Sequence, residues 1–157
     1  MSIEACRAYF RALGREGDIL EFDVSSATVE LAAQAVGCPP AQIAKTLSFR
    51  VGEGCVLIVC AGDAKIDNPK YKAQFHCKAA MLSPEEVLAF TGHAVGGVCP
   101  FGIENPAVTT YLDVSLRRFD RVYPAAGSAN SAIPLTCDDL ARFSRSAGWV
   151  DVCKNWG

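Results

Sequence analysis

A lysine at position 45 stands on the apolar side of a strand-like segment, KTLSFRV (45–51). Because side chains alternate between the two faces of a strand, Lys45 shares its face with Leu47 and Phe49. Such a lysine either reaches water from the end of the strand, or it forms a fixed cation at a cleft that binds an anion or stabilises developing negative charge. The pattern by itself leaves both interpretations open.

A glycine-rich stretch, GHAVGGVCPFG (92–102), places four glycines and one proline in eleven residues. Glycine costs about 0.5–1 kcal/mol relative to alanine inside a regular element, so this stretch predicts a sharp turn or a close approach of backbone to another molecule. A tight turn with close packing explains the glycines as well as a loop whose bare N–H groups face a ligand. The stretch matches neither a phosphate-binding P-loop nor a dinucleotide fingerprint.

Cys99 and His93 lie in the same stretch and form a candidate thiol–imidazole pair, as a cysteine hydrolase would need. A metal site is not expected, because the eight cysteines form no CxxC pair and the chain has two histidines. We therefore expect no metal and no cofactor. Most of the cysteines are interpreted as reduced, buried, small apolar side chains.

The order of the helices and strands expected around these residues predicts one α+β domain over residues 1–157. Its β-sheet is expected to be curved, mixed but mainly antiparallel, barrel-like and flanked by helices. The segment CVLIVCA is apolar on both faces, so it is expected in the centre of the sheet. Ser26 and Ser83 are expected N-caps, and Ser83 begins a capping box. The expected helices are 2–16, 27–36, 68–75, one starting after Ser83, and 136–146; the expected strands are 18–24, 44–51, 55–61, 109–112, 121–123 and 131–135.

Composition and charge limit the classes of function. The chain has 157 residues, 50% of them hydrophobic, and a net charge of −2, which disfavours a protein that coats nucleic acid through bulk charge. A local basic patch stays possible in residues 63–79, which carry Lys65, Lys70 and Lys72, although a solvated helix surface explains these lysines too. We find no secretory leader and no apolar run of about 18 residues, so we expect a cytoplasmic protein without a membrane span.

Five segments, taken in order, resemble the YbaK/ProX family of aminoacyl-tRNA editing domains. The resemblance covers roughly residues 18–147, and its most specific part is the combination of the Lys-Thr-Leu strand with the Gly-x-x-x-Pro loop from Gly96 to Pro100. It implies a deacylase that hydrolyses the ester of a mischarged tRNA. The segments are LAAQAVGCPPAQIAKTLSF (31–49), VLIVCAGDAKID (56–67), GHAVGGVCPFG (92–102), TTYLDVSL (109–116) and AAGSANSAIPL (125–135).

The same resemblance implies the roles of individual residues. Lys45 would be the essential lysine and would hold the terminal phosphate or ribose, while the amides of Gly96 and Gly97 would stabilise the oxyanion. Phe22 and Val24 would help to line a pocket for a small amino acid such as Cys or Ala. Further substrate-binding residues would be Thr46, Val98, Cys99, Pro100 and Gly127.

The implied partners are the 3′ acceptor end of a mischarged tRNA, with tRNA(Pro) as the expected species, and prolyl-tRNA synthetase as a candidate protein partner. Lys65, Lys70 and Lys72 would contact the acceptor stem. Two alternatives remain: a tRNA- or nucleotide-binding module that kept the fold without the chemistry, and a thiol hydrolase built on Cys99 and His93. The nucleophile of the editing reaction would be water or a group of the substrate itself.

Overall fold

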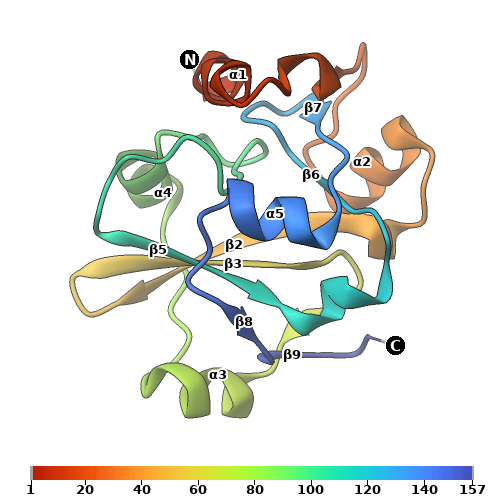
Figure 1. Ribbon diagram of the computed structural model, residues 1–157. Helices are drawn as coiled ribbons and strands as arrows, with labels where there is room; N and C mark the ends of the chain where they lie inside the picture. Colours follow the sequence, from red (N-terminus) through yellow and green to blue (C-terminus); the bar gives the residue numbers. More distant parts are fainter. Residues whose placement is uncertain (1, 157) are drawn as a thin grey trace.

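Two long strands form the centre of the fold in the computed structural model, which describes residues 2–156 (Figure 1). Strands β2 (Ile43–Val51) and β3 (Gly54–Ala61) pair as an antiparallel hairpin from Ala44–Ala61 to Val51–Gly54. The turn between them uses Gly52 with φ +60°, a left-handed conformation that glycine adopts without strain. Residues 55–61 of β3 are all buried, which confirms the expected central position of this strand.

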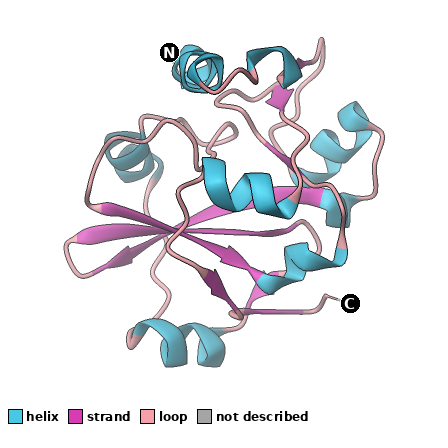
Figure 2. Cartoon of the chain, viewed as in Figure 1, coloured by secondary structure: helices cyan, strands magenta, loops and turns pink. Residues whose placement is uncertain are grey.

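The remaining elements are short and surround this hairpin (Figures 1 and 2). The helices are α1 (Ser2–Ala12), α2 (Val29–Val36), α3 (Asn68–Phe75), α4 (Pro84–Thr91) and α5 (Cys137–Phe143). The 3-10 helices are η1 (Glu16–Asp18), η2 (Pro40–Gln42) and η3 (Val114–Arg118). The other strands are β1 (Leu20–Glu21), β4 (Lys65–Ile66), β5 (Val108–Asp113), β6 (Tyr123–Pro124), β7 (Ser131–Ala132), β8 (Trp149–Val150) and β9 (Cys153–Lys154).

The main sheet has the strand order β6-β2-β3-β5-β8. The β2–β3 pair is antiparallel, whereas β6 joins β2, β5 joins β3 and β8 joins β5 in parallel. Two small antiparallel pairs, β1–β7 and β4–β9, complete the strands of the described residues. The mixed α+β architecture expected from the sequence is confirmed.

The two faces of the β2–β3 hairpin pack against different helices. On one face, Phe49 contacts Tyr71 of α3, with their ring centroids 5.1 Å apart. On the other face, Leu57 belongs to an apolar cluster with Val87 of α4. Figure 1 accordingly shows α3 on one side of the sheet and α4 on the other. Residues on opposite faces of β2 therefore meet different surroundings.

Helix ends follow the expected capping chemistry in most places. Ser83 forms a full capping box with Glu86, and α2 ends at Gly37 in a left-handed conformation. The expected cap Ser26 is wrong, because the Thr28 hydroxyl accepts from the Leu31 N–H at the start of α2. The expected strand 18–24 shrinks to β1, because only two residues find a partner in β7 and Val24 beyond them stays exposed.

Candidate active site

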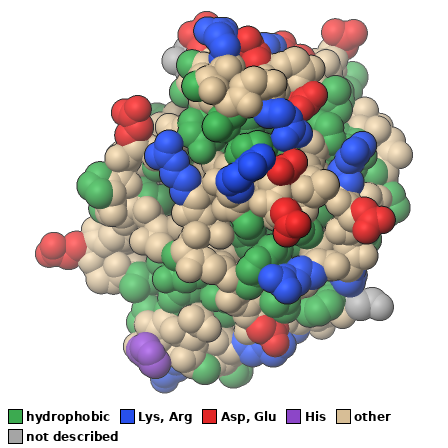
Figure 3. Space-filling model, in the orientation of Figure 1, with side chains coloured by type: hydrophobic (Ala, Val, Ile, Leu, Met, Phe, Trp, Pro, Cys, Tyr) green, Lys and Arg blue, Asp and Glu red, His purple; other side chains and the backbone are tan. Residues whose placement is uncertain are grey.

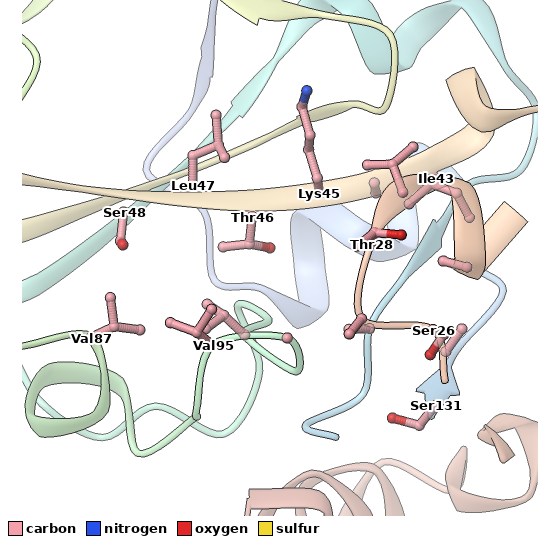
Figure 4. Close-up of a pocket in the computed structure, with 18 of the residues that line it drawn as sticks. Ser26, Thr28, Ile43, Lys45, Thr46, Leu47, Ser48, Val87, Val95 and Ser131 are labelled. Atoms are coloured by element: carbon pink, nitrogen blue, oxygen red, sulfur yellow. The ribbon is translucent and has the colours of Figure 1, made fainter. Parts of the chain in front are cut away.

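A cavity of about 390 Å³ lies beside β2, between the start of α2, the residues after α4 and the β6–β7 segment (Figure 4). Its wall is mostly apolar, with a few hydroxyl and backbone groups, as in many small-molecule sites. Lys45, Thr46, Gly96 and Val98 are the sequence-predicted site residues that line it. The other lining residues are Ser26, Ala27, Thr28, Val29, Ala32, Ile43, Ala44, Leu47, Ser48, Met81, Leu82, Pro84, Val87, Val95, Tyr123, Ala125, Ser131 and Ala132.

Even-numbered residues of β2 turn their backbone groups away from β3. In an antiparallel pair, alternate residues direct both N–H and C=O to the same side. The Arg50 N–H donates to the Ala80 carbonyl (2.8 Å), and the Ser48 carbonyl accepts from the Leu82 N–H (3.3 Å). Both contacts lie outside the hairpin, so the backbone groups of Thr46 also point to this outer edge.

Thr46 occupies a one-residue gap in the hydrogen bonding along that edge, which we call the Thr46 gap. On one side of it, β6 pairs with β2 at Ile43 and Ala44. On the other side, Leu82 bonds to Ser48. Within residues 2–156, no backbone partner covers Thr46 itself on this side. Because Leu82 and Ala44 both line the cavity, the Thr46 gap opens into it.

Two hydroxyl groups beside the cavity also have no hydrogen-bond partner among the described residues: Ser26 Oγ and Thr46 Oγ1. Figure 4 shows the Thr46 side chain on the side of β2 that faces Val95. An unpaired buried polar group costs about 1–3 kcal/mol, so proteins rarely keep one without a use. The free hydroxyls and the Thr46 gap together provide donors and acceptors for a bound ligand.

Lys45 lines the same cavity with its stem, but its ammonium group points away from the cavity. The Nζ donates to the carbonyl oxygens of Gly62 (3.4 Å) and Ala64. Figure 4 shows the Lys45 and Thr46 side chains leaving β2 in opposite directions, as strand alternation requires. The ammonium group thus lies at the turn 62–64, which follows β3.

A carboxylate beside Lys45 adds to the local electrostatics. Asp63 receives two hydrogen bonds from Arg118, at 3.0 Å and 2.6 Å. This ion pair lowers the pKa of the Asp63 carboxyl, and the Lys45 charge contributes in the same direction. The turn 62–64 thus presents two carbonyls and a neighbouring carboxylate to the lysine.

The two neighbouring glycines of the loop, Gly96 and Gly97, have different roles in the structure. Gly96 has φ +99° and lines the cavity, and a Cβ there would lie 3.4 Å from Ala27 Cβ. The Gly97 N–H already donates to the Ala94 carbonyl (3.0 Å), and a Cβ on Gly97 would lie 2.7 Å from the Ser128 backbone. Gly97 therefore allows two loops to pack closely, and the amide available to a ligand in this conformation is that of Gly96.

Several predicted substrate-binding residues lie outside the cavity wall. Val24 is 61% exposed, and the Phe22 N–H donates to the Asn130 carbonyl. Pro100 borders a different, smaller cavity of about 170 Å³. Gly127, with φ +97°, precedes the Ser128 backbone that contacts Gly97.

Cys99 and His93 do come together, but they lie in the protein core. The Cys99 Sγ is 3.5 Å from His93 Nε2, and both residues are buried. Burial raises the pKa of the Cys99 thiol well above its ordinary value. A buried, protonated thiol outside the cavity is no nucleophile for a substrate in it, so the structure contradicts the thiol-hydrolase alternative.

The basic segment lies on the α3 side of the sheet. Lys70 is paired with Asp151 (3.0 Å) and with the Cys153 carbonyl (3.1 Å), whereas Lys65 and Lys72 are exposed. Figure 3 shows basic and acidic side chains interspersed on the visible face, with no large single-sign field. This distribution agrees with the net charge of −2.

Sequence reasoning missed the hydroxyl groups of Ser26, Ser48 and Ser131 in the cavity wall. Ser26 has the residue type of a helix cap, and Ser48 sits in a strand whose polar side resembles a solvated face. The signal that distinguishes them is tertiary: both are buried, although neither belongs to an apolar pattern.

Comparison with known sequences places the chain in a family. Residues 24–143 match the family model of the aminoacyl-tRNA editing domain. The chain is 57% identical to the uncharacterized protein YwhH of Bacillus subtilis (strain 168) over 159 residues, with 99% of both chains covered. The chain therefore belongs to the aminoacyl-tRNA editing domain family, and the resemblance found in its motifs is confirmed.

Two further relatives are associated with prolyl-tRNA synthesis. The chain is 31% identical over 93 residues to the proline–tRNA ligase of Thermotoga sp. (strain RQ2), covering 59% of this chain and 16% of the ligase. One similar crystal structure is that of a protein provisionally assigned as a trans-editing enzyme for prolyl tRNA synthetase. Its superposition on this chain has a TM-score of 0.87 and 28% sequence identity, and it covers 98% of this chain and 97% of that chain. Within the described residues, no helix is long and apolar enough to span a membrane.

Proposed function

We propose that this chain is a trans-editing aminoacyl-tRNA deacylase that acts as a free-standing protein and hydrolyses the ester of a mischarged tRNA. The proposed substrate carries a small amino acid such as Cys or Ala on tRNA(Pro), and the proposed protein partner is prolyl-tRNA synthetase, in the cytoplasm. The observation that carries the proposal is the Thr46 gap, which presents free backbone groups to a largely apolar cavity beside Gly96.

The polar groups of the cavity suit an aminoacyl ester. The carbonyl oxygen of an ester needs donors as it becomes an oxyanion, and a single well-placed donor is worth about 3 kcal/mol. The N–H groups of Gly96 and Thr46 are the backbone donors we assign to this oxygen. The Thr46 carbonyl and the two unpaired hydroxyls are available to the substrate amine and ribose.

The apolar wall favours a small amino-acid side chain. Ile43, Val87 and Val95 line a cavity of about 390 Å³ that must also admit the ester and part of the ribose. An apolar pocket of this kind rejects a larger side chain by steric exclusion, whereas it separates two small ones by only about 1–3 kcal/mol per methylene. We therefore expect Ala and Cys esters to be cleaved and larger amino acids to be excluded.

The chemistry does not use a side-chain general base from the cavity wall. The residues that line it include no Asp, Glu or His among residues 2–156. The nucleophile is therefore water or, in a Cys ester, the thiol of the substrate itself, positioned against a polarised carbonyl. Attack forms the tetrahedral oxyanion, and its collapse releases the tRNA hydroxyl.

Lys45 is proposed to bind the terminal phosphate or ribose region. Its ammonium group must release the carbonyls of Gly62 and Ala64 and turn around the open edge of β2 to do so. Lysine carries its charge on a flexible stem with rotatable donors, which suits such an exchange of partners. The charge would then orient the ester toward Gly96.

The direct test is a panel of tRNA(Pro) charged with Ala, Cys or Pro and incubated with wild type or Lys45→Met. We expect wild type to release Ala or Cys and to spare Pro, and Lys45→Met to be strongly impaired. Lys154→Met is the matched control, because this exposed lysine lies in β9, outside the cavity wall. Failure of wild type to release any amino acid would disprove the deacylase.

A silent tRNA-binding module is the second candidate. It is favoured by one observation: the ammonium group of Lys45 is engaged with backbone carbonyls and faces away from the cavity. A module of this kind would bind the mischarged tRNAs without cleaving them. Equal tRNA affinity of wild type and Lys45→Met, with no release of amino acid in either, would establish this reading.

A further inference from the structure

Three ligating side chains from distant parts of the sequence meet in the core. Cys6 comes from α1, while His93 and Cys99 come from the segment that follows α4. The two thiol sulfurs are 3.4 Å apart, and Cys99 Sγ is 3.5 Å from His93 Nε2. The ligand atoms of all three residues lie within 4.8 Å of one another, and all three residues are buried.

A backbone oxygen lies beside the same three atoms. The Phe101 carbonyl accepts a hydrogen bond from His93 Nε2–H (2.8 Å), so this oxygen could serve as a fourth donor once the ring proton leaves Nε2. The other ring nitrogen, His93 Nδ1, is buried without a hydrogen-bond partner among the described residues, and His93 itself is 1% exposed.

We propose, in contrast to the expectation from the sequence, that Cys6, His93 and Cys99 form a binding site for Zn²⁺, because these three side chains meet only in the folded chain. Two thiolates and one imidazole nitrogen form a donor set that zinc favours, and a carbonyl or water oxygen can complete four-coordination. Binding replaces two S–H bonds by two Zn–S bonds and releases two protons, while the imidazole stays neutral because its proton moves from Nε2, where it faces the Phe101 carbonyl, to Nδ1. The site is separate from the cavity and does not depend on the proposed deacylase activity.

The ion would join the N-terminal helix to the glycine loop. The ring of Phe10 in α1 already packs on that of Phe101, with centroids 4.9 Å apart. Zinc bound at Cys6 and Cys99 would add a strong link across 93 residues of sequence, next to the loop that carries Gly96. Because Cys6 and Cys99 have no exposed surface, we expect the ion to enter during folding or through transient opening of α1.

Chance contact between buried thiols is the competing explanation, and the chain provides a comparison. Cys60 and Cys153 are a second buried pair of interacting thiols, and neither is part of the metal-ligand cluster found in residues 2–156. Of these two pairs in the described part of the chain, Cys6–Cys99 is the one with a histidine in reach. Retention of metal should therefore depend on Cys6, Cys99 and His93, and not on other cysteines.

The experiment uses full-length protein without a histidine tag, refolded under reducing conditions with and without Zn²⁺. We expect one equivalent of Zn²⁺ per chain by elemental analysis, a higher Tm, and an affinity that rises by up to about 100-fold per pH unit because two protons leave. Cys6→Ser, Cys99→Ser and His93→Asn should each lose the tightly bound equivalent. Cys38→Ser, which changes a partly buried thiol outside the cluster, should retain it.

A spectroscopic measurement on wild type covers the case in which a variant does not fold. Co²⁺ in place of Zn²⁺ should give a thiolate-to-metal charge-transfer band in the near ultraviolet and the visible bands of tetrahedral cobalt. Absence of these bands, or failure of wild type to retain Zn²⁺ against a micromolar chelator, would overturn the proposal. Metal retained by folded Cys6→Ser, or lost by Cys38→Ser, would overturn it equally.

Discussion

Lys45 and Thr46 are neighbours in β2, yet they serve opposite sides of the strand: the Lys45 ammonium group binds the carbonyls of Gly62 and Ala64, whereas Thr46 faces the cavity. A cavity at the edge of a strand can be reached by side chains from both faces of that strand, because no further strand covers the backbone there. The relation between these two residues gives the first two predictions.

Replacement of Lys45 by methionine keeps the packing stem and removes the charge. We expect deacylation of Ala-tRNA(Pro) to fall about 100-fold, because a group that positions the ester for attack is lost. Single-turnover rates and Tm should be measured together. A fall in Tm with unchanged single-turnover rates would show that the lysine only holds the turn 62–64.

Thr46→Val removes a hydroxyl that lacks a partner while conserving the shape of the side chain. We expect the free energy of unfolding to rise by about 1 kcal/mol, because the unsatisfied group is removed, and deacylation to fall about tenfold. The matched control is Thr91→Val, since the Thr91 hydroxyl donates to the Val87 carbonyl (2.7 Å) and its loss should destabilise the fold. Equal stability effects of both variants in urea unfolding would contradict this prediction.

Gly97→Ala should destabilise the protein by about 1–3 kcal/mol, because the new methyl group would overlap the Ser128 backbone. Separation of the two loops should also lower deacylation. Gly17→Ala is the control: no atom lies within 4 Å of the added Cβ, so its effect on stability should stay within about 0.5 kcal/mol. Thermal and urea unfolding measure both, and similar curves for the two variants would refute the close-packing argument.

Stability of the metal-free protein should fall as the pH drops below about 6.5. Burial lowers the pKa of His93 in the folded state, so the unfolded chain binds a proton that the folded chain does not. Stability is therefore fully present above the unfolded pKa and decreases by up to about 1.4 kcal/mol per pH unit below it. Urea unfolding between pH 7 and pH 5 should show this slope in wild type and a smaller slope in His93→Asn; identical slopes would exclude His93 as the cause.

Lys65 and Lys72 are the exposed lysines that we predict to contact tRNA, whereas Lys70 is already paired with Asp151. The change of both Lys65 and Lys72 to Ala should weaken tRNA binding and reduce the slope of log Kd against log salt by up to about 2. The identity of the amino acid removed should not change. Filter binding at several salt concentrations is the measurement, and unaltered affinity would show that the two lysines are plain surface.

Local chemistry made part of this fold predictable. The capping box at Ser83 involves residues only three apart in the sequence. The run 55–61 is apolar on both faces, which by itself indicates a central position in the sheet. The Thr46 gap was not predictable, because it exists only where β6 and residues 80–82 reach β2 from different parts of the chain. The direction of the Lys45 ammonium group depends on the turn 62–64 in the same way.

The candidate site shows the same division between local and distant information. The glycine at position 96 and the strand from position 45 could be identified from short motifs, and both line the cavity. The close approach of Gly97 to Ser128 and the meeting of Cys6 with Cys99 join segments that no local pattern connects. Because of these contacts, the Gly96 amide rather than the Gly97 amide is available to a ligand. Cys99 is buried in the core, where it cannot act as a nucleophile.

The short length of the Thr46 gap has a consequence for the behaviour of the protein in solution. A long uncovered strand edge would invite strands from other molecules and lead to aggregation. Here pairing with β6 ends at Ala44 and pairing with Leu82 begins at Ser48, so the uncovered stretch is too short to template a foreign strand. The free N–H and C=O groups of Thr46 are therefore accessible to a small ligand, but they are too few to pair with a strand of another molecule.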